Sequence, residues 1–486
     1  FIMQLTELIK NIEFTDIRGN DDIEINKVSK NSNEIADGDL FVAIEGSNFD
    51  GHDFIIDAIE KGAKCILCEK NEYLVNDEIT YVFTNCTKEA YAKVCSNYFD
   101  NPSKKLNLVG ITGTNGKTTT ANLLYQMFSI NNIKSGLIST NEIIVNSETY
   151  KTKLTTPDSF DLNFYLDKMV DRGVRFCFME VSSHSIDQRR IAGLKFELAI
   201  FTNITHDHLN YHKTFKNYLN VKKRFFDDLD KDCMSLINLD DKNAKYISQN
   251  TNSKVFGLSI MNNGDFKLKI IENSFSGLLI KVDDKLINTQ LIGKFNAYNL
   301  LTVLSASKLL GLENKKIFIG LSMLKNPEGR FDVIKINDVI GIVDYAHSPD
   351  ALMNVLETIA NIKQKENSIV TVVGCGGGRD KEKRFKMGKI ASKLSHKVIF
   401  TSDNPRDEDP KLIIEDMLKG VEMEDRTKVI YELDRKEAIV KASKIVKPKD
   451  ILLVAGKGHE DFQIIKSEKI KFNDKDILKE TLKMAV

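Results

Sequence analysis

LVGITGTNGKTTT, residues 108–120, is the stretch of sequence that decides the fold of this chain. Apolar residues lead into a turn with glycines at positions 110, 113 and 116. Lys117 and three threonines follow, and apolar residues then recur at helical spacing from Leu123 to Phe128. A strand, a glycine-rich loop and a helix N-terminus in this order form a phosphate cradle. The glycines let backbone N–H groups turn toward one anion, and the helix dipole favours negative charge.

Two side chains make the cradle specific for a nucleotide triphosphate. Lys117 adds a full positive charge, and Thr118 offers its hydroxyl to a Mg²⁺ on the outer phosphates. The strict pattern G-x-x-x-x-G-K-[ST] is not met, because its first glycine would fall at Ile111. The competing interpretation is a helix-capping loop with a surface lysine. The residues predicted to surround the phosphates are Gly113, Thr114, Asn115, Gly116, Lys117, Thr118 and Thr119.

Composition excludes several classes of protein. The 69 basic and 69 acidic residues balance, so no electrostatic footprint for nucleic acid or an anionic membrane is present. No run approaches the roughly 18 apolar residues of a membrane span, and no signal peptide is recognised. The seven cysteines form no paired framework, and Cys65 and Cys68 lie in an apolar stretch typical of a buried strand. We expect a cytoplasmic monomer with neither nucleic-acid partner nor membrane insertion.

The 486 residues divide into three predicted α/β domains, at 1–105, 106–327 and 328–486. In the middle domain, apolar strands alternate with helices, which predicts a mostly parallel, phosphate-loop-type sheet with helices on both faces. Residues 266–282 are predicted to leave it as an antiparallel excursion. In the last domain, strands again end in loops of Gly, Asp, Asn, Arg or His, which predicts a Rossmann-like sheet with polar loops along one edge.

Two polar segments follow strands of the middle domain. Glu180 ends a strand, and its carboxylate can join Thr118 on a Mg²⁺, which prefers hard oxygen ligands. The alternative is a strand-end glutamate paired with a lysine. The segment HDHLNYH, residues 206–212, invites a zinc interpretation, but the helical H-E-x-x-H pattern is absent. One histidine on a second Mg²⁺ is more economical, and His212 is left unassigned.

In combination, the motifs resemble those of the Mur ligases, which extend the peptide of the bacterial peptidoglycan precursor. The resemblance covers nearly the whole chain and is closest to the member that adds the third peptide residue. The N-terminal GDLFVAIEG and DGHDF resemble its uridine-binding domain and argue against folylpolyglutamate and cyanophycin relatives. The other motifs are TGTNGKTT, EVSSH, NITHDHLNYH, GRFD, DYAHSPD, GCGGGRDKEKR, SDNPRDEDP and GKGHED, in that order.

The resemblance implies a reaction and a set of residues. ATP phosphorylates a substrate carboxyl group to an acyl phosphate, and the amine of an amino acid displaces the phosphate to form an amide. Lys117, Thr118 and Glu180 would serve ATP and the first Mg²⁺, and His208 the second. Lys222 matches the lysine that the family carbamylates with CO₂, although Lys223 stands beside it. The resemblance implies adenine contacts for Asn296 and Asn299, and nucleotide contacts from the C-terminal domain for Arg330 and Asp344.

The resemblance also implies two further substrates. One is UDP-MurNAc-L-Ala-D-Glu, with the uridine contact at Ser32 and the muramoyl-peptide contacts at Thr155, Thr156, Ser182, Gln188 and Arg190. The other is meso-diaminopimelate, with contacts at Arg379, Asp403, Asn404, Arg406, Gly456 and Glu460. The segment DNPR, residues 403–406, is the form found in enzymes that add diaminopimelate. The chemistry agrees, because a guanidinium grips the second carboxylate that lysine lacks, and Glu460 suits the distal ammonium.

Alternatives and departures remain. Arg406 could instead pair with Asp407 or Glu408, and the enzyme could then add L-lysine. A sister ligase and a nucleotide-binding protein without catalysis are further alternatives. Gly378 stands where the family commonly has aspartate, and Phe385 where it has proline. Both departures bear on the amino-acid pocket and leave the ATP site untouched.

Overall fold

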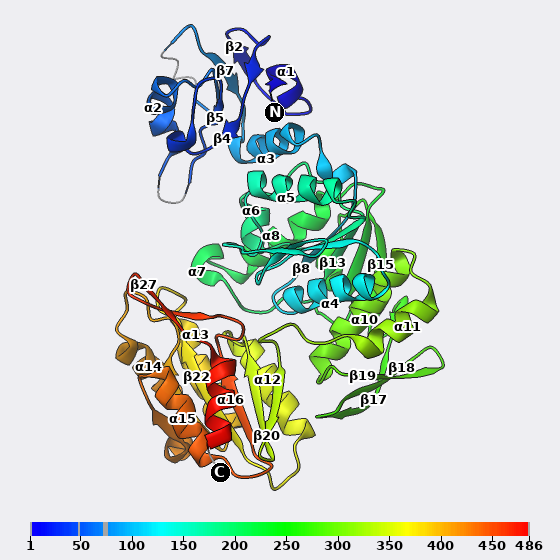
Figure 1. Ribbon diagram of the computed structural model, residues 1–486, viewed down its shortest axis with the longest axis vertical. Coiled ribbons are helices and arrows are strands. Elements are labelled where there is room, and N and C mark those ends of the chain that lie inside the picture. Colours follow the sequence, from blue (N-terminus) through cyan, green and yellow to red (C-terminus); the bar gives the residue numbers. More distant parts are fainter. Residues whose placement is uncertain (1, 47–48, 71–75, 485–486) are drawn as a thin grey trace.

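The computed structural model describes residues 2–46, 49–70 and 76–484. Three α/β units follow one another along the long axis, with the N-terminal unit at one end and the C-terminal unit at the other (Figure 1). The predicted fold class is confirmed. None of the helices in the described ranges has the length and apolarity needed to cross a membrane.

The N-terminal unit is built on a five-stranded sheet in the order β2-β7-β6-β5-β4, parallel except for the β2–β7 pair. Gly62 ends the preceding helix at φ +103°, and strand β6, with Cys65 and Cys68, is buried as expected. The strands are β2 (Asp16–Arg18), β4 (Val28–Ser29), β5 (Leu40–Val42), β6 (Cys65–Cys68) and β7 (Thr80–Phe83), with the pair β1 (Met3–Gln4) and β3 (Glu24–Ile25) beside them. The helices are α1 (Leu5–Leu8), η1 (Ser32–Glu34), η2 (Gly51–Phe54), α2 (Ile55–Glu60), α3 (Thr87–Tyr98) and η4 (Pro102–Lys104).

The central unit surrounds β8 (Asn107–Thr112), the strand that leads into the glycine loop. Its side chains alternate between two buried layers. Val109 and Ile111 pack with α4 (Lys117–Ile130) and α10 (Lys294–Leu309), whereas Leu108 packs with α5 (Ser159–Asp171) and α8 (Phe215–Asp227). Helices therefore cover both faces of the sheet (Figure 1).

The central sheet has nine strands in the order β11-β10-β9-β12-β8-β13-β14-β15-β16, parallel from β9 to β16. The remaining strands are β9 (Ser135–Ile138), β10 (Ile143–Val145), β11 (Glu148–Tyr150), β12 (Phe176–Glu180), β13 (Leu198–Phe201), β14 (Met234–Asn238), β15 (Lys254–Ser259) and β16 (Phe266–Lys267). Its other helices are α6 (Ser183–Asp187), α7 (Leu209–His212), α9 (Ala244–Ile247) and α11 (Asn314–Met323).

The predicted antiparallel excursion is present, but it begins three residues later than expected. It is a three-stranded sheet of β17 (Lys269–Ser274), β18 (Gly277–Val282) and β19 (Lys285–Thr289). Phe266 and Lys267 instead pair in parallel with Leu258 and Ser259 at the edge of the central sheet. The short edge strand β16 has no pattern of its own that separates it from the excursion.

The C-terminal unit has a six-stranded sheet in the order β20-β21-β25-β22-β23-β24, parallel except for the β20–β21 pair. The strands are β20 (Asp332–Ile336), β21 (Val339–Asp344), β22 (Ile369–Cys375), β23 (Lys397–Ser402), β24 (Val429–Tyr431) and β25 (Ile451–Ala455), and a hairpin adds β26 (Phe462–Ile465) and β27 (Glu468–Lys471). The helices are α12 (Pro349–Ile362), α13 (Glu382–Leu394), α14 (Pro410–Leu418), η5 (Met423–Lys428), α15 (Arg435–Ile445) and α16 (Asp474–Met484).

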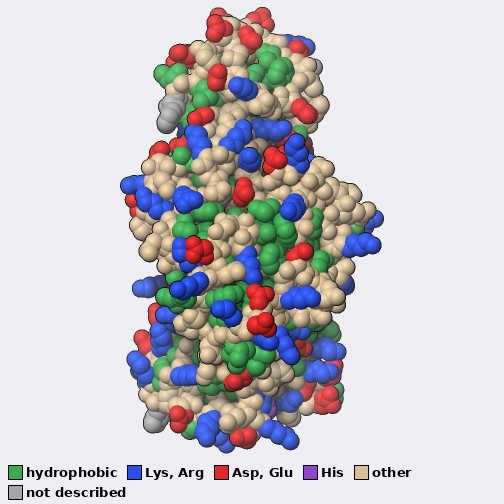
Figure 2. Space-filling view, turned by 90° about the vertical axis from the view of Figure 1, so that its right-hand side faces the viewer, with side chains coloured by type: hydrophobic (Ala, Val, Ile, Leu, Met, Phe, Trp, Pro, Cys, Tyr) green, Lys and Arg blue, Asp and Glu red, His purple; other side chains and the backbone are tan. Residues whose placement is uncertain are grey.

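The order of the strands gathers the polar loops. β12 and β13 flank β8, so Glu180 and the histidine segment meet the glycine loop at one sheet edge. β21, β25, β22 and β23 are neighbours, so the loops after them share an edge of the C-terminal sheet. On the face shown in Figure 2, basic and acidic side chains are interspersed, as the balanced composition predicts.

Candidate active site

The glycine loop is shaped by close contacts that leave no room for side chains. A Cβ on Gly113, which has φ +152°, would lie 1.9 Å from Oγ1 of Thr202, the residue that follows β13. That hydroxyl donates a hydrogen bond to the carbonyl of Asn115 at 2.7 Å. Gly116 has φ +88° and is the N-cap of α4. The loop therefore leads directly into the N-terminus of a 14-residue helix, where backbone N–H groups attract anions.

Two lysines share one carbonyl oxygen of this loop. Nζ of Lys117 and Nζ of Lys222 donate to the carbonyl of Gly113 at 2.9 and 2.8 Å. Burial, together with the charge of Lys117, lowers the pKa of Lys222 well below its usual range. Lys223 on the same helix instead pairs with Asp227 at 2.5 Å. Between the two neighbouring lysines, Lys222 is therefore the one that faces the phosphate loop.

Glu180 is fully buried at the end of β12 and has no lysine partner among the described ion pairs. Its Oε2 accepts a hydrogen bond from the Thr118 hydroxyl at 3.0 Å, and its Oε1 accepts from the backbone N–H of Thr140 at 2.7 Å. Arg330, from the C-terminal unit, donates to the same Thr118 hydroxyl at 3.1 Å. Buried hard-oxygen donors beside a phosphate loop fit Mg²⁺.

The histidine segment contributes one candidate ligand. His208 has φ +55°, and burial with the charges of Lys117 and Lys222 lowers the pKa of its imidazole, while the charge of Asp207 opposes this shift. The Asp207 carboxylate lies 3.6 Å from its Nε2. His212 is buried and bonds Ser183 at 3.0 Å, which is a structural role. In the described ranges, no cluster of three or more His, Cys, Asp or Glu side chains is arranged to hold a metal ion.

The two asparagines predicted to contact adenine lie on α10 beside the loop. The side-chain carbonyl of Asn299 accepts a hydrogen bond from Thr120 at 3.3 Å, and its amide donates to Asn296 at 2.9 Å. Gly116 permits this approach, since a Cβ there would lie 2.9 Å from Asn299. The remaining nucleotide candidate, Asp344, accepts a hydrogen bond from the Phe331 N–H at 2.7 Å, and burial raises its pKa to about 6.

The residues predicted to contact the muramoyl-peptide form one polar cluster next to Glu180. The Thr156 hydroxyl donates to the Glu180 carbonyl at 2.7 Å and lies 3.3 Å from the Ser182 hydroxyl. Arg190 donates to the Thr156 carbonyl at 2.9 Å and to Gln188 at 2.5 Å. Thr155 joins the cluster through Thr140, whose hydroxyl lies 3.1 Å from its own.

The uridine candidate lies in the N-terminal unit, apart from this cluster. Ser32 is buried at the start of η1. Two residues before it, Lys30 forms an ion pair of 2.6 Å with Asp158, which caps α5. This pair joins the N-terminal unit to the segment that carries Thr155 and Thr156. An elongated substrate could therefore span the two units.

The predicted amino-acid pocket lies at the edge of the C-terminal sheet. Arg406 has φ +53°, and its guanidinium donates to the Gly377 carbonyl at 2.7 Å. It forms no described ion pair with Asp407 or with Glu408, and Glu408 instead pairs with Arg384 at 3.0 Å. Burial and the charge of the nearby Arg379 lower the pKa of Arg406. Arg406 thus lies near a second positive charge, and the hydrogen bonds described for its guanidinium go only to backbone carbonyls.

The remaining pocket residues pack together behind Arg406. The Asn404 amide donates to Oε2 of Glu460 at 2.9 Å. Gly456 has φ +118°, and a Cβ there would lie 2.7 Å from the Asp403 carboxylate, so a side chain is excluded. Gly378, one of the two departures, has φ +63°, and a Cβ there would meet only Arg406 at 3.8 Å. The other departure, Phe385, is exposed.

Sequence reasoning missed Asp350, a residue that joins two units. Asp350 lies in the first turn of α12, and its Oδ2 accepts from Asn115 of the phosphate loop at 2.7 Å and from Thr205 at 3.2 Å. It stands in the quoted motif DYAHSPD, but nothing in the motif indicates a partner 235 residues away. A cavity of about 200 Å³ lies beside this contact, between the central and C-terminal units.

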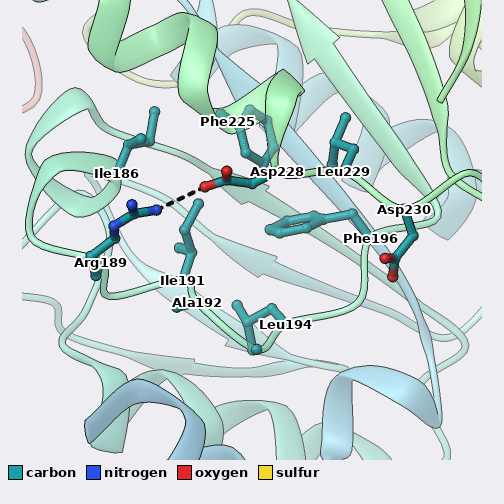
Figure 3. Close-up of a pocket in the computed structure, with 11 residues that line it drawn as sticks. Ile186, Arg189, Ile191, Ala192, Leu194, Phe196, Phe225, Asp228, Leu229 and Asp230 are labelled. Atoms are coloured by element: carbon teal, nitrogen blue, oxygen red, sulfur yellow. Dashed lines mark hydrogen bonds and ion pairs between the residues drawn. The ribbon is translucent and has the colours of Figure 1, made fainter. Parts of the chain in front are cut away.

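A second cavity, of about 80 Å³, lies away from the phosphate loop (Figure 3). Apolar side chains, among them Ile191 and Phe225, line it. An ion pair of 2.8 Å between Arg189 and Asp228 crosses its rim. None of the residues predicted for the site lines it, so it plays no part in the chemistry below.

The fold and the site define a nucleotide-binding enzyme of the phosphate-loop class. Comparison with known proteins refines this class. Three domain descriptions match the chain: "Mur ligase family, catalytic domain" at residues 24–102, "Mur ligase middle domain" at 111–307 and "Mur ligase, glutamate ligase domain" at 329–458. The chain belongs to the Mur ligase family and is therefore a ligase, as its motifs predicted.

Individual relatives agree with this family. The chain is 48% identical to a UDP-N-acetylmuramoyl-L-alanyl-D-glutamate–2,6-diaminopimelate ligase of Bacteroides fragilis, covering 100% of both chains. It is 40% identical to the ligase of that name from Clostridium tetani, covering 99% of each. A solved structure of a ligase of that name has a TM-score of 0.69 at 28% identity, with 99% of both chains covered. The MurF ligase of Thermotoga maritima in complex with ADP shares the fold, with a TM-score of 0.61 at 19% identity over 95% of this chain and 97% of that one.

Proposed function

We propose that this chain is the ATP-dependent ligase that joins meso-2,6-diaminopimelate to UDP-MurNAc-L-Ala-D-Glu. The relatives named above, which match it over their full length, support both substrates. The observation that carries the choice of amino acid is the position of Arg406. Its guanidinium lies on the Gly377 carbonyl beside Arg379 and is not neutralised by the acidic residues that follow it. A carboxylate at the far end of the amino acid is the ligand that such a pair recognises.

The chemistry begins with the nucleotide. The N-terminus of α4 and Lys117 hold the outer phosphates, Arg330 reaches them from the C-terminal unit, and Asn296 and Asn299 lie beside the loop for the base. The γ-phosphoryl group passes from ATP to the D-glutamyl carboxylate, which becomes an acyl phosphate while ADP leaves. The amine of diaminopimelate then attacks the carbonyl carbon, and phosphate leaves as the amide forms. Fixed positive charges stabilise the phosphoryl oxygens throughout.

Mg²⁺ fits this site because the buried oxygen donors Thr118 and Glu180 and the imidazole of His208 lie around the loop. Thr118 and Glu180 would hold one ion, and His208 with a carbamylated Lys222 a second. Bound Mg²⁺ supplies charge that compensates the phosphates. Carbamylation requires a neutral amine. Burial and the charge of Lys117 favour that form at Lys222 by lowering its pKa.

Each unit has a proposed task. Residues 1–105 bind the UDP end of the substrate through Ser32, 106–327 bind ATP and the peptide, and 328–486 bind the amino acid. The cluster of Thr155, Thr156, Ser182, Gln188 and Arg190 would orient the D-glutamyl carboxylate next to Glu180. A monomer in the cytoplasm remains a prediction, which sedimentation and cell fractionation test.

Phosphate release from ATP tests the function. With UDP-MurNAc-L-Ala-D-Glu, Mg²⁺ and bicarbonate, we expect kcat/KM for phosphate release to be about 10²–10⁴-fold higher with meso-diaminopimelate than with L-lysine. Release with lysine alone contradicts the choice of amino acid, and release with neither contradicts the function.

Carbamylation needs its own test. Native mass spectrometry in bicarbonate should detect one added CO₂ in the wild type and in Lys223→Ala, and none in Lys222→Ala. The added mass persisting in Lys222→Ala would remove Lys222 from this role.

A further inference from the structure

A lysine that no step above uses lies at the back of the amino-acid pocket. Lys457 follows β25 directly after Gly456, and its side chain is 0% exposed. Its ammonium donates to Oδ1 of Asn404 at 3.0 Å and to Oε2 of Glu460 at 2.7 Å. Burying an ammonium group is costly unless it is paired and hydrogen-bonded, so these two contacts fix where the group lies.

The ammonium determines how the Asn404 amide is oriented. Lys457 can only donate hydrogen bonds, so the amide must turn its oxygen toward it. The same oxygen accepts from the backbone N–H of Ile464 at 2.9 Å, and the amide nitrogen donates to Oε2 of Glu460 at 2.9 Å. Both ends of the amide are thus used inside the protein. Asn404 therefore braces the pocket, and the second N–H of its amide is left for the predicted contact with diaminopimelate.

The same contacts divide the two oxygens of Glu460 between protein and pocket. Oε2 receives hydrogen bonds from both Lys457 and Asn404. Oε1 has no hydrogen-bond partner in the described part of the chain, and the side chain is 20% exposed. One oxygen is therefore held by the protein, and the other is left for a ligand.

Charge gives Lys457 a second effect. Arg379, Arg406 and Lys457 bring three positive charges to the pocket, and Asp403 and Glu460 bring two negative charges. The neighbouring Arg435 is neutralised by Asp474 at 2.7 Å and leaves this balance unchanged. The far end of diaminopimelate has an ammonium and a carboxylate, which suits this excess of positive charge. The far end of lysine has an ammonium alone and is repelled by it. Without Lys457, the two signs balance and the ammonium of lysine is better tolerated.

We propose that Lys457 is a positioning residue that sets amino-acid selectivity. It fixes Glu460 with one oxygen toward the ligand, and its charge disfavours an amino acid whose far end is only cationic. This inference rests on the proposed function, because the two amino acids compared are those of the proposed reaction.

Substitution of Lys457 tests the proposal through phosphate release at varied diaminopimelate and varied L-lysine. Lys457→Met removes both the donors and the charge, whereas Lys457→Gln keeps a donor for Asn404 and removes the charge. For Lys457→Met we expect KM for diaminopimelate to rise at least tenfold. In both variants the ratio of kcat/KM for diaminopimelate over lysine should fall at least tenfold, with KM for ATP unchanged. If Lys457→Met does not fold, the ratio in Lys457→Gln decides.

A second lysine near the same ring serves as the control. Lys469 is exposed on β27, and its Nζ lies 4.8 Å from the ring centre of Phe462, which Lys457 approaches to 5.9 Å. Lys469→Met should leave unchanged both KM for diaminopimelate and the ratio of kcat/KM for diaminopimelate over lysine. An unchanged selectivity ratio in a folded Lys457 variant overturns the proposal. A wild-type enzyme that releases no phosphate with diaminopimelate overturns the proposed function and this inference together, and is recognised before any variant is compared.

Discussion

At the scale of single residues, Arg406 determines the predicted choice of amino acid. Its guanidinium keeps hydrogen-bonding capacity because its contacts are backbone carbonyls, at 2.7 Å to Gly377 and 3.4 Å to Asn404. Charged hydrogen bonds contribute roughly 1.5–3 kcal/mol each, and a guanidinium can form two to one carboxylate. A side chain without charge at this position loses both.

We therefore expect Arg406→Met to lower kcat/KM for diaminopimelate by about 10²–10⁴-fold. Two such hydrogen bonds contribute about 3–6 kcal/mol together, and about 1.4 kcal/mol corresponds to a tenfold change. Steady-state phosphate release measures it, with KM for ATP as an internal reference. Arg426→Met, an exposed position in η5, is the matched control and should match the wild type. A loss below fivefold in Arg406→Met contradicts the assignment.

We expect Asp344 to make the free energy of unfolding depend on pH. Burial raises its pKa from 3.8 to about 6, so between about pH 4 and pH 6 the folded state binds more protons at this group than the unfolded state. The free energy of unfolding therefore falls as the pH rises through this window. The difference between the two pKa values corresponds to about 3 kcal/mol.

Chemical denaturation at several pH values measures this effect. Relative to the wild type, Asp344→Asn should gain stability by up to about 3 kcal/mol as the pH rises from 4 to 7, because it has no carboxyl group to ionise. If the free energy of unfolding depends on pH in the same way in both proteins, the pKa of Asp344 is not raised in the folded state.

At the scale of elements, the connection from β8 to α4 tolerates no side chain at Gly113. A Cβ there would lie 1.9 Å from the Thr202 hydroxyl, which supports the loop through the Asn115 carbonyl. Gly311 has φ +85°, and a Cβ there would have no other atom within 4 Å. A side chain at Gly311 therefore meets only the backbone strain of the left-handed conformation, about 1–2 kcal/mol.

We expect Gly113→Ala to destabilise the protein more than Gly311→Ala does, and to raise KM for ATP at least tenfold. Thermal unfolding and phosphate release measure the two effects. Gly311→Ala should leave KM for ATP unchanged, because it lies after α10 and away from the loop. Equal KM values for ATP in the two variants would mean that the loop adjusts around the added methyl group.

At the scale of the whole molecule, Asp350 and Arg330 connect the C-terminal unit to the phosphate loop and the residues beside it. Asp350 accepts hydrogen bonds from Asn115 and Thr205, and Arg330 donates to Thr118. The proposed reaction uses groups from both units, so we expect these contacts to link the arrangement of the units to ATP binding.

Asp350→Ala should therefore raise KM for ATP by about tenfold, since hydrogen bonds to charged groups contribute roughly 1.5–3 kcal/mol. It should also increase the radius of gyration in solution scattering. Glu357→Ala, an exposed position on the same helix α12, should change neither. An unchanged KM for ATP in Asp350→Ala would show that the hydrogen bonds of Asp350 do not contribute to nucleotide binding.

The sequence by itself determined the local parts of this protein. LVGITGTNGKTTT predicted a strand, loop and helix, because glycine spacing and apolar periodicity depend only on neighbouring residues. The same reasoning placed Glu180 at the end of a strand and Arg406 in the loop that follows one. The resemblance carried by the motifs supplied Lys222, Ser32 and the amino-acid substrate, which no spacing rule contains.

Only the tertiary structure decided which of these residues meet. It separated Lys222 from Lys223, because helix α8 turns one toward Gly113 and the other toward Asp227. It paired Asp350 with Asn115 and Lys457 with Asn404, and it placed Phe266 in the central sheet. Such contacts join residues far apart in the chain, so their energy depends on the packing of whole elements and leaves no trace in the local pattern.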